Sequence, residues 1–265
     1  MATAPHAIAL GGMLALGVPV VFFNAINARA WKKRLFYFLV LSVFPLCIYY
    51  THSRGPWAML GIEILYLGLS EKKTRKWLIL LILLFITGMI IRPGVYYTIR
   101  DTLRGSFGRG ILAGSTEYRK AILFAVWDAV KRNPLRLLFG YGEGTGRFLG
   151  LTGYVFARKM TFYAIDNGYA HVLLHEGLLG LLAFLILIGS VHLYISRSLK
   201  TYPYLWICKS FLAILWGLYF ILYTIAFLDW HQPAYLFWTL LGAVLGCIEK
   251  ERRKNEKGSS IHREY

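Results

Sequence analysis

Long apolar runs constrain this chain more than any other feature of its sequence. A helix needs about 20 predominantly apolar residues to cross the hydrocarbon core of a bilayer, within a range of about 17–25. The first run, residues 7–27, carries no Asp, Glu, Lys or Arg. Further apolar runs cover residues 35–51, 55–70, 77–91, 172–195, 205–228 and 233–248. The sequence therefore predicts an all-α fold, a polytopic membrane helical bundle of about seven spans.

The composition agrees with insertion into a membrane. Hydrophobic residues make up 57% of the chain and charged residues 16%, whereas soluble domains average about 45–50% and about 25%. These values exclude a soluble enzyme, a disordered tail and a disulfide scaffold. Cys47, Cys208 and Cys247 all lie inside apolar runs, so neither a disulfide framework nor a cysteine-based zinc site is expected.

The connections between the predicted spans alternate between basic and nearly uncharged. Lys and Arg cluster after spans one, three, five and seven, and cytoplasmic loops collect such residues. The net charge of +17 is therefore interpreted first as a topology signal and not as a sign of nucleic-acid binding. The chain is predicted to divide into spans one to four (1–91), an extracytoplasmic basic loop (92–165), spans five to seven (166–248) and a cytoplasmic basic tail (249–265).

The long predicted loop is cationic although it lies on the outer face. Its Lys and Arg residues far outnumber its four acids, Asp101, Glu117, Asp128 and Glu143. Long loops cross the membrane largely regardless of charge, so the predicted topology stands. A cationic outer loop calls for an anionic partner, which is either the headgroups of the bilayer or a phosphate-bearing substrate.

Two segments of this loop have distinct patterns. Residues 118–132 lack Gly and Pro and precede Asn133-Pro134, which predicts a helix that lies against the membrane or the span bundle. Residues 139–144 are rich in glycine but lack the Lys-Ser/Thr pair of a phosphate-binding P-loop. Their glycines are expected to permit tight turns near a ligand.

His171 and His175 would lie one turn apart on a helix that starts near Gly168. That spacing suits a metal ion, but the zinc-protease signature places Glu directly after the first His. Here Val172 occupies that place and Glu176 follows the second His. The sequence therefore predicts no metal site, and the alternative role of these histidines is interfacial hydrogen bonding.

Three groups of residues resemble one family. Thr51-His52-Ser53-Arg54-Gly55 is similar to the Ser-Arg-Gly corner of the O-antigen ligase and O-antigen polymerase family. Arg119, Trp127, Pro134 and residues 138–142 resemble its outer-loop pattern. Asp166-Asn167-Gly168-Tyr169, followed by residues 176–180, resembles its signature of His or Asp, then Asn, leading into Glu, Gly, Leu and Gly. The resemblance covers roughly residues 35–200.

The resemblance implies a glycosyltransferase of the bacterial inner (plasma) membrane with an extracytoplasmic active face. Its donor would be a glycan linked to polyprenyl diphosphate, such as undecaprenyl diphosphate, and its acceptor a glycan or lipid A–core. Such an enzyme serves lipopolysaccharide and cell-surface polysaccharide synthesis without nucleotide sugars, cofactor or metal.

The chain departs from the family in three ways. Asp166 stands where ligases usually have His, His175 takes the usual Glu position, and the spans are fewer.

The expected catalytic residues follow from this chemistry. Arg54 and Arg119 would stabilise the charge that develops on the departing diphosphate. Asp166 would accept the proton of the acceptor hydroxyl, and His171 is the alternative base. Further residues are expected to bind substrate: Arg109, Arg132, Arg158, Asn167 and Tyr169.

A non-enzymatic lipid-linked glycan flippase or scaffold subunit is the competing class. A flippase is expected to line its path with charges inside several spans. The predicted spans carry almost none beyond Glu63 and Lys209, which favours an enzyme working at the membrane surface.

Overall fold

The structure is a computed structural model that describes residues 6–70 and 114–261, with isolated positions 74–76, 79, 83 and 100 between them. The chain is mostly helical, as its apolar runs predict. Two earlier expectations, the span at 77–91 as a whole and the role of Arg109, fall on residues outside the described part.

The described chain divides into two compact units. The first contains residues 1–71, 189–219 and 230–265, and the second contains residues 72–188 and 220–229. Helices α8 (Gly168–Thr201) and α9 (Trp206–Thr224) contribute residues to both units. Each unit is described by itself.

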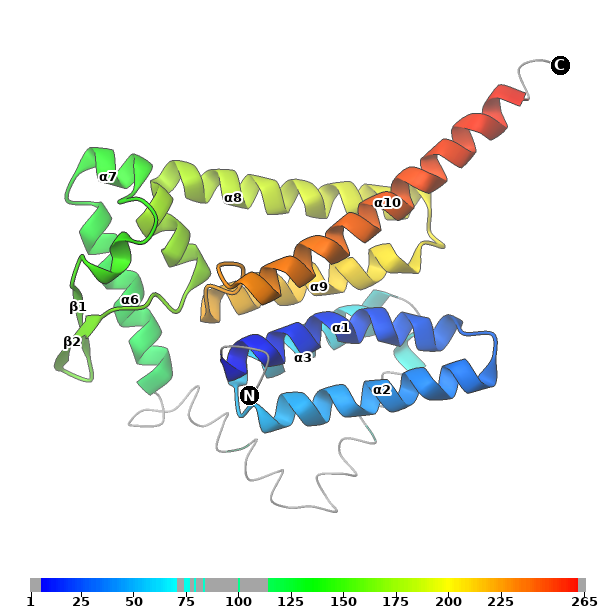
Figure 1. Ribbon diagram of the computed structural model, residues 1–265, viewed down its shortest axis with the longest axis horizontal. Coiled ribbons are helices and arrows are strands. Elements are labelled where there is room, and N and C mark those ends of the chain that lie inside the picture. Colours follow the sequence, from blue (N-terminus) through cyan, green and yellow to red (C-terminus); the bar gives the residue numbers. More distant parts are fainter. Residues whose placement is uncertain are drawn as a thin grey trace. The chain divides into compact units, whose positions relative to one another are not determined.

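The first unit is built on three N-terminal helices and α10 (His231–Ile261). Helix α1 (Ala7–Asn27) packs against α2 (Trp31–Tyr50) and α3 (Arg54–Ser70) and also contacts α10 (Figure 1). A Cβ at Gly11 would lie 2.6 Å from Pro56 Cγ, so glycine permits α1 to approach the start of α3.

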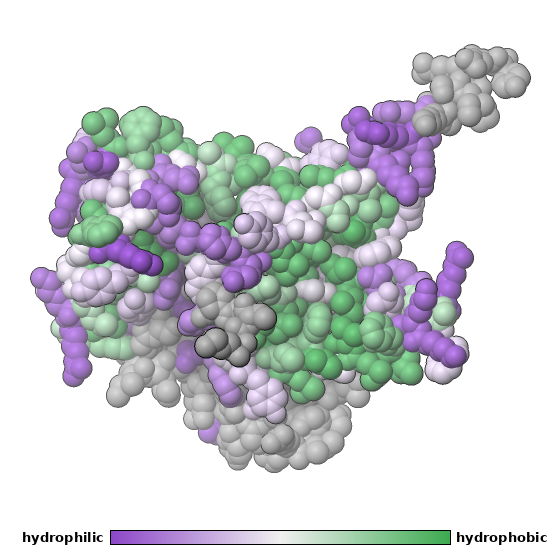
Figure 2. All heavy atoms as spheres, in the orientation of Figure 1, coloured by the Kyte–Doolittle hydropathy of each residue, from purple (hydrophilic) through white to green (hydrophobic). Residues whose placement is uncertain are grey.

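Four of the described helices are long and apolar enough to cross a membrane: α1, α2, α8 and α9. The chain is thus a membrane protein by the length and composition of its helices. Large apolar side chains remain exposed along α2 and α8, and Figure 2 shows apolar side chains over α1 and α2. Such surface suits lipid contact, because soluble monomers rarely expose large apolar patches. The count of seven spans and the outer placement of the loop stay predictions.

The second unit surrounds a small apolar core. Helix α6 (Gly114–Val130) confirms the helix predicted over 118–132, with shifted ends. It packs against a β-hairpin, and its expected position against the membrane or the span bundle stays a prediction. Side chains from α6, the hairpin and the start of α8 make up the core: Ile122, Val126, Val130, Leu151, Val155, Phe162 and Leu174. A short helix, α7 (Pro134–Phe139), and a 3-10 turn, η2 (Thr145–Arg147), carry the chain from α6 to the hairpin.

The hairpin is where the all-α expectation fails. Strands β1 (Leu151–Val155) and β2 (Arg158–Phe162) pair antiparallel, with Leu151 opposite Phe162. Their two-residue turn, Phe156-Ala157, has positive φ angles of 49° and 63°. Two-residue turns with positive φ normally carry Asn-Gly or Asp-Gly. The sequence lacks that signal, so the hairpin was not predicted.

Candidate functional site

The start of α8 is separated from the rest of the helix by a break at Gly177. Gly177 has φ 70° and ψ −166°, which is not helical. A break of this kind deprives the preceding carbonyl groups of their helical N–H partners. Tyr141 N–H donates to Leu174 O and Gly142 N–H donates to His175 O, each at 2.8 Å. The glycine-rich loop therefore supplies the donors that the broken helix lacks.

Glycine is required where this loop and α8 meet. A Cβ at Gly140 would lie 2.3 Å from His175 O, and one at Gly177 would lie 2.4 Å from Leu138 O. Both backbones also adopt positive φ, a region that side-chain-bearing residues rarely enter. The expected tight turns of residues 139–144 are present, since Gly140, Gly142 and Gly144 all have positive φ.

Asn167 links the beginning of α8 to the end of α9. Its Oδ1 accepts from Ala170 N–H at 2.9 Å, which is an N-terminal helix cap. Its Nδ2 donates to Tyr223 O at 2.9 Å, and the side chain is fully buried. The amide thus makes hydrogen bonds with the chain's own backbone at both ends. The predicted contact of Asn167 with a sugar hydroxyl stays a prediction.

Arg119 meets the same end of α9. It is half-buried on α6, and its Nε donates to Thr224 O at 3.0 Å. Unsatisfied carbonyl groups give a helix C-terminus partial negative charge, so a guanidinium is favoured there. The motif residues Arg119 and Asn167, far apart in the sequence, therefore bind neighbouring peptide groups.

Asp166 lies close to this arrangement. It precedes Asn167 and is half-buried. The pKa of Tyr118, the neighbour of Arg119, is raised first by burial of its phenol and second by the negative charge of Asp166. The predicted cation Arg119 and the predicted base Asp166 thus belong to one region of the second unit.

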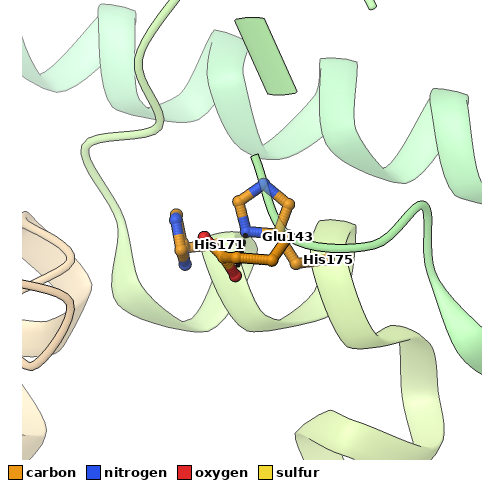
Figure 3. Close-up of side chains that lie close together, drawn as sticks. All are labelled: Glu143, His171 and His175. Atoms are coloured by element: carbon orange, nitrogen blue, oxygen red, sulfur yellow. Dashed lines mark ion pairs between the residues drawn. The ribbon is translucent and has the colours of Figure 1, made fainter. Parts of the chain in front are cut away.

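His171 and His175 lie close to Glu143 (Figure 3), and Asp229 lies beside His171. The sequence analysis gave neither acid a role at these histidines. The two imidazole centroids are 4.1 Å apart and the rings are perpendicular at 89°. His175 Nδ1 lies 3.4 Å from Glu143 Oε2, and His171 Nε2 lies 3.6 Å from Asp229 Oδ2. His175 is 5% exposed. No sequence spacing links these acids to the histidines. The glycine-rich loop carries Glu143 and the connection between α9 and α10 carries Asp229, and both approach α8 only in the folded chain.

The remaining predicted site residues lie elsewhere. Arg132 follows α6 and Arg158 begins β2, and both are exposed, while Tyr169 is half-buried in the first turn of α8. Arg54 begins α3 in the first unit. Its approach to Arg119 and Asp166, on which the sequence hypothesis depends, stays a prediction.

Comparison with protein families matches residues 39–185 to the O-antigen ligase family. The matched segment is more than half of the chain and includes Arg54, Arg119 and the start of α8. The chain belongs to the O-antigen ligase family. The resemblance found in the sequence is thus confirmed. Membership of the O-antigen ligase family supports a membrane glycosyltransferase-like role in polysaccharide biosynthesis. A comparison with curated proteins gives no match.

Proposed function

We propose that this O-antigen ligase family chain transfers a glycan from polyprenyl diphosphate to a glycan or lipid A–core acceptor. The reaction takes place at the outer face of the bacterial inner membrane and serves lipopolysaccharide or related polysaccharide synthesis. Family membership supports the reaction class. The observation that supports the assignment of residues is that Arg119 and Asn167, the residue after Asp166, bind consecutive carbonyl groups at the end of α9.

The leaving group requires fixed positive charge. The bond between the sugar's anomeric carbon and the diphosphate oxygen breaks, and its electron pair stays on the diphosphate. Arg119 is held in place through Thr224 O, so its guanidinium needs little reorganisation as that charge grows. Arg54 is the second proposed cation, and Arg109, Arg132 and Arg158 are proposed to bind the donor's phosphates and sugars.

The acceptor hydroxyl requires a base. Its oxygen attacks the anomeric carbon and its proton passes to Asp166, so that polyprenyl diphosphate is released and one glycosidic bond is formed. His171 is the alternative base, and the carboxylate of Asp229 lies 3.6 Å from its Nε2. Asn167 fixes the start of the helix that carries His171. Because its side chain is fully buried and bonded to backbone at both ends, it is proposed to act as a positioning residue, and Tyr169 is proposed to contact sugar hydroxyls.

A transfer assay with purified protein tests this proposal. The chain is reconstituted in vesicles with a lipid-linked repeat unit and offered either a second repeat unit or lipid A–core. Chain growth on the first acceptor identifies a polymerase, and a single transfer to the second identifies a ligase. Movement of the lipid-linked glycan across the bilayer without any transfer would instead identify the competing flippase, and inactivity on both counts would favour the scaffold subunit.

A further inference from the structure

We propose that Glu143, His171 and His175 bind one zinc-class divalent cation, which joins the glycine-rich loop to the start of α8. The proposal goes beyond the transfer reaction, in which Asp166 is the first proposed base and no step uses a metal. It assigns His171 to the ion, and because a neutral imidazole has one acceptor nitrogen, a ring that binds the ion does not also accept the acceptor's proton. It also departs from the expectation, drawn from the sequence, that the chain has no metal site.

The spacing of the three side chains suits a single ion. One ligand atom from each residue lies within 4.8 Å of the others. Zinc binds imidazole nitrogen and carboxylate oxygen at about 2.0–2.2 Å, so two such ligands at a tetrahedral angle are about 3.4 Å apart. His175 Nδ1 and Glu143 Oε2 are 3.4 Å apart. These two atoms therefore already have the separation of a bound pair.

The burial of His175 provides an independent argument. The residue is 5% exposed, yet neither of its ring nitrogens forms a hydrogen bond within the residues that the structure describes. Buried polar atoms without partners are uncommon because burial removes their water. The Nε2 nitrogen of His175 points at Gly146, where an added Cβ would lie 3.4 Å away. The other ring nitrogen, Nδ1, faces Glu143 and is therefore the one that could bind an ion. A cation bound to Nδ1 would supply the partner that this nitrogen lacks.

The donor set indicates which cation fits. Two imidazoles and one carboxylate suit zinc and similar first-row ions, whereas magnesium and calcium prefer oxygen ligands throughout. Three protein ligands leave one tetrahedral position for water. Asp229 Oδ2 lies 3.6 Å from His171 Nε2, beyond hydrogen-bond distance. A small closure of this gap would give the carboxylate contact that commonly orients metal-bound histidines.

The backbone around the site is organised before any ion binds. Glu143 lies between Gly142 and Gly144, and Gly142 N–H donates to the carbonyl of His175 itself. Thr145 Oγ1 donates to Gly142 O at 2.6 Å and tightens the turn. The Glu143 side chain is 73% exposed and would be ordered on binding. The third ligand comes from a loop upstream of the histidines, which is why the protease signature did not reveal it.

Zinc binding by the purified full chain tests the proposal. The protein is isolated in detergent with a tag free of histidine, stripped with a chelator, and titrated with Zn²⁺ against a chromophoric competitor. We expect one equivalent of bound zinc, no comparable binding of Mg²⁺, and a tetrahedral absorption spectrum with Co²⁺. Glu143→Gln and His175→Gln should each weaken zinc binding by at least about 10-fold. His231→Gln, at an exposed histidine outside the cluster, should bind zinc like the wild type.

The zinc titration distinguishes loss of the site from misfolding of a variant. Glu143 is exposed, so Glu143→Gln gives a folded comparison even where His175→Gln unfolds, and circular dichroism checks both variants. No zinc binding by the wild type would reduce the cluster to a Glu143–His175 ion pair and overturn the proposal. Wild-type affinity in both variants would place the ion elsewhere and overturn it equally. Because the readout is metal binding, failure of the transfer assay leaves this result unaffected.

Discussion

Arg119 and Asn167 donate hydrogen bonds to consecutive carbonyl oxygens at the end of α9. Arg119 Nε reaches Thr224 O at 3.0 Å, and Asn167 Nδ2 reaches Tyr223 O at 2.9 Å. Two family motifs are thereby fixed to one point of the second unit. The proposed cation and the residue next to the proposed base are thus held by the same backbone segment.

Replacing Arg119 should abolish most of the glycan transfer. Loss of one preorganised donor to a developing negative charge typically costs about 10²–10³ in turnover, so Arg119→Ala should fall in that range. Turnover should suffer more than donor binding because the charge grows as the bond breaks. Arg119→Lys should restore little, since an ammonium cannot reproduce the planar guanidinium. Rates are measured on lipid-linked repeat units.

Arg252→Ala is the matched control for Arg119→Ala. Arg252 is an exposed arginine of α10 that lies near Glu249 and Glu256. Its loss removes one positive charge without touching α9 or α6, so transfer should stay at the wild-type rate. Full activity of Arg119→Lys would reduce Arg119 to a general lipid anchor and contradict its assigned role.

Asp166→Asn separates the two candidate bases. The change preserves size and removes the carboxylate, so transfer should fall by about 10²–10⁴-fold if Asp166 accepts the proton. His171→Gln should have a smaller effect, and Asp166→His should retain part of the activity. Near-normal transfer by Asp166→Asn to both acceptors would move the role of base to His171.

The ionisation of Tyr118 reports on the position of Asp166. Burial and the negative charge of Asp166 both raise the pKa of Tyr118. Asp166→Asn removes the second cause only, so the pKa of Tyr118 should fall but stay above its ordinary value. An alkaline titration of ring-labelled tyrosine followed by NMR measures this, with Tyr118→Phe to assign the signal. An unchanged pKa in Asp166→Asn would mean that the carboxylate points away from α6.

Gly140→Ala and Gly142→Ala form a matched pair for the contact between the loop and α8. Both glycines have positive φ, 71° and 89°. A non-glycine residue held at a sparsely populated backbone conformation of positive φ costs roughly 1–3 kcal/mol of stability. A Cβ at Gly140 would also collide with His175 O at 2.3 Å, whereas nothing lies within 4 Å at Gly142. Gly140→Ala should therefore lower the midpoint of thermal unfolding clearly more than Gly142→Ala. Equal shifts would show that the contact with α8 adds nothing.

The predicted topology is testable with single cysteines in a chain whose native cysteines are replaced. Arg158→Cys in β2 and Lys254→Cys in α10 both introduce thiols at exposed positions. An impermeant thiol reagent should label Arg158→Cys on intact cells and Lys254→Cys only after permeabilisation. The reverse pattern would remove the active face from the outer side and with it the proposed reaction.

The helices were the predictable part of this fold. The uncharged run over 7–27 forms α1 with the same ends, because an apolar segment of that length has few alternatives to a helix in a bilayer. The hairpin was not predictable, since Phe156-Ala157 is not a typical sequence for its turn. The apolar runs can be recognised from residue types alone. The turn of the hairpin cannot, because its strands are held by the apolar core that they join.

The site was predictable only in its side chains. Arg119, Asp166 and Asn167 were recognised by motif, but the partners of Arg119 and Asn167 are the backbone carbonyls of residues 223 and 224. Every residue has such a carbonyl, so no pattern marks these two. The approach of Glu143 to His175 likewise depends on the break in α8 at Gly177, which needs the loop to fill it.

The break at Gly177 also separates α8 into two parts that can bend relative to one another. A span longer or shorter than the surrounding hydrocarbon layer adapts by tilting or kinking, and a helix bends most easily where its hydrogen-bond ladder is already interrupted. The ladder is interrupted at Gly177, and the turns before it are tied to residues 141 and 142. We therefore expect residues after Gly177 to tilt with the thickness of the lipid, while His171 and His175 keep the geometry set by the loop.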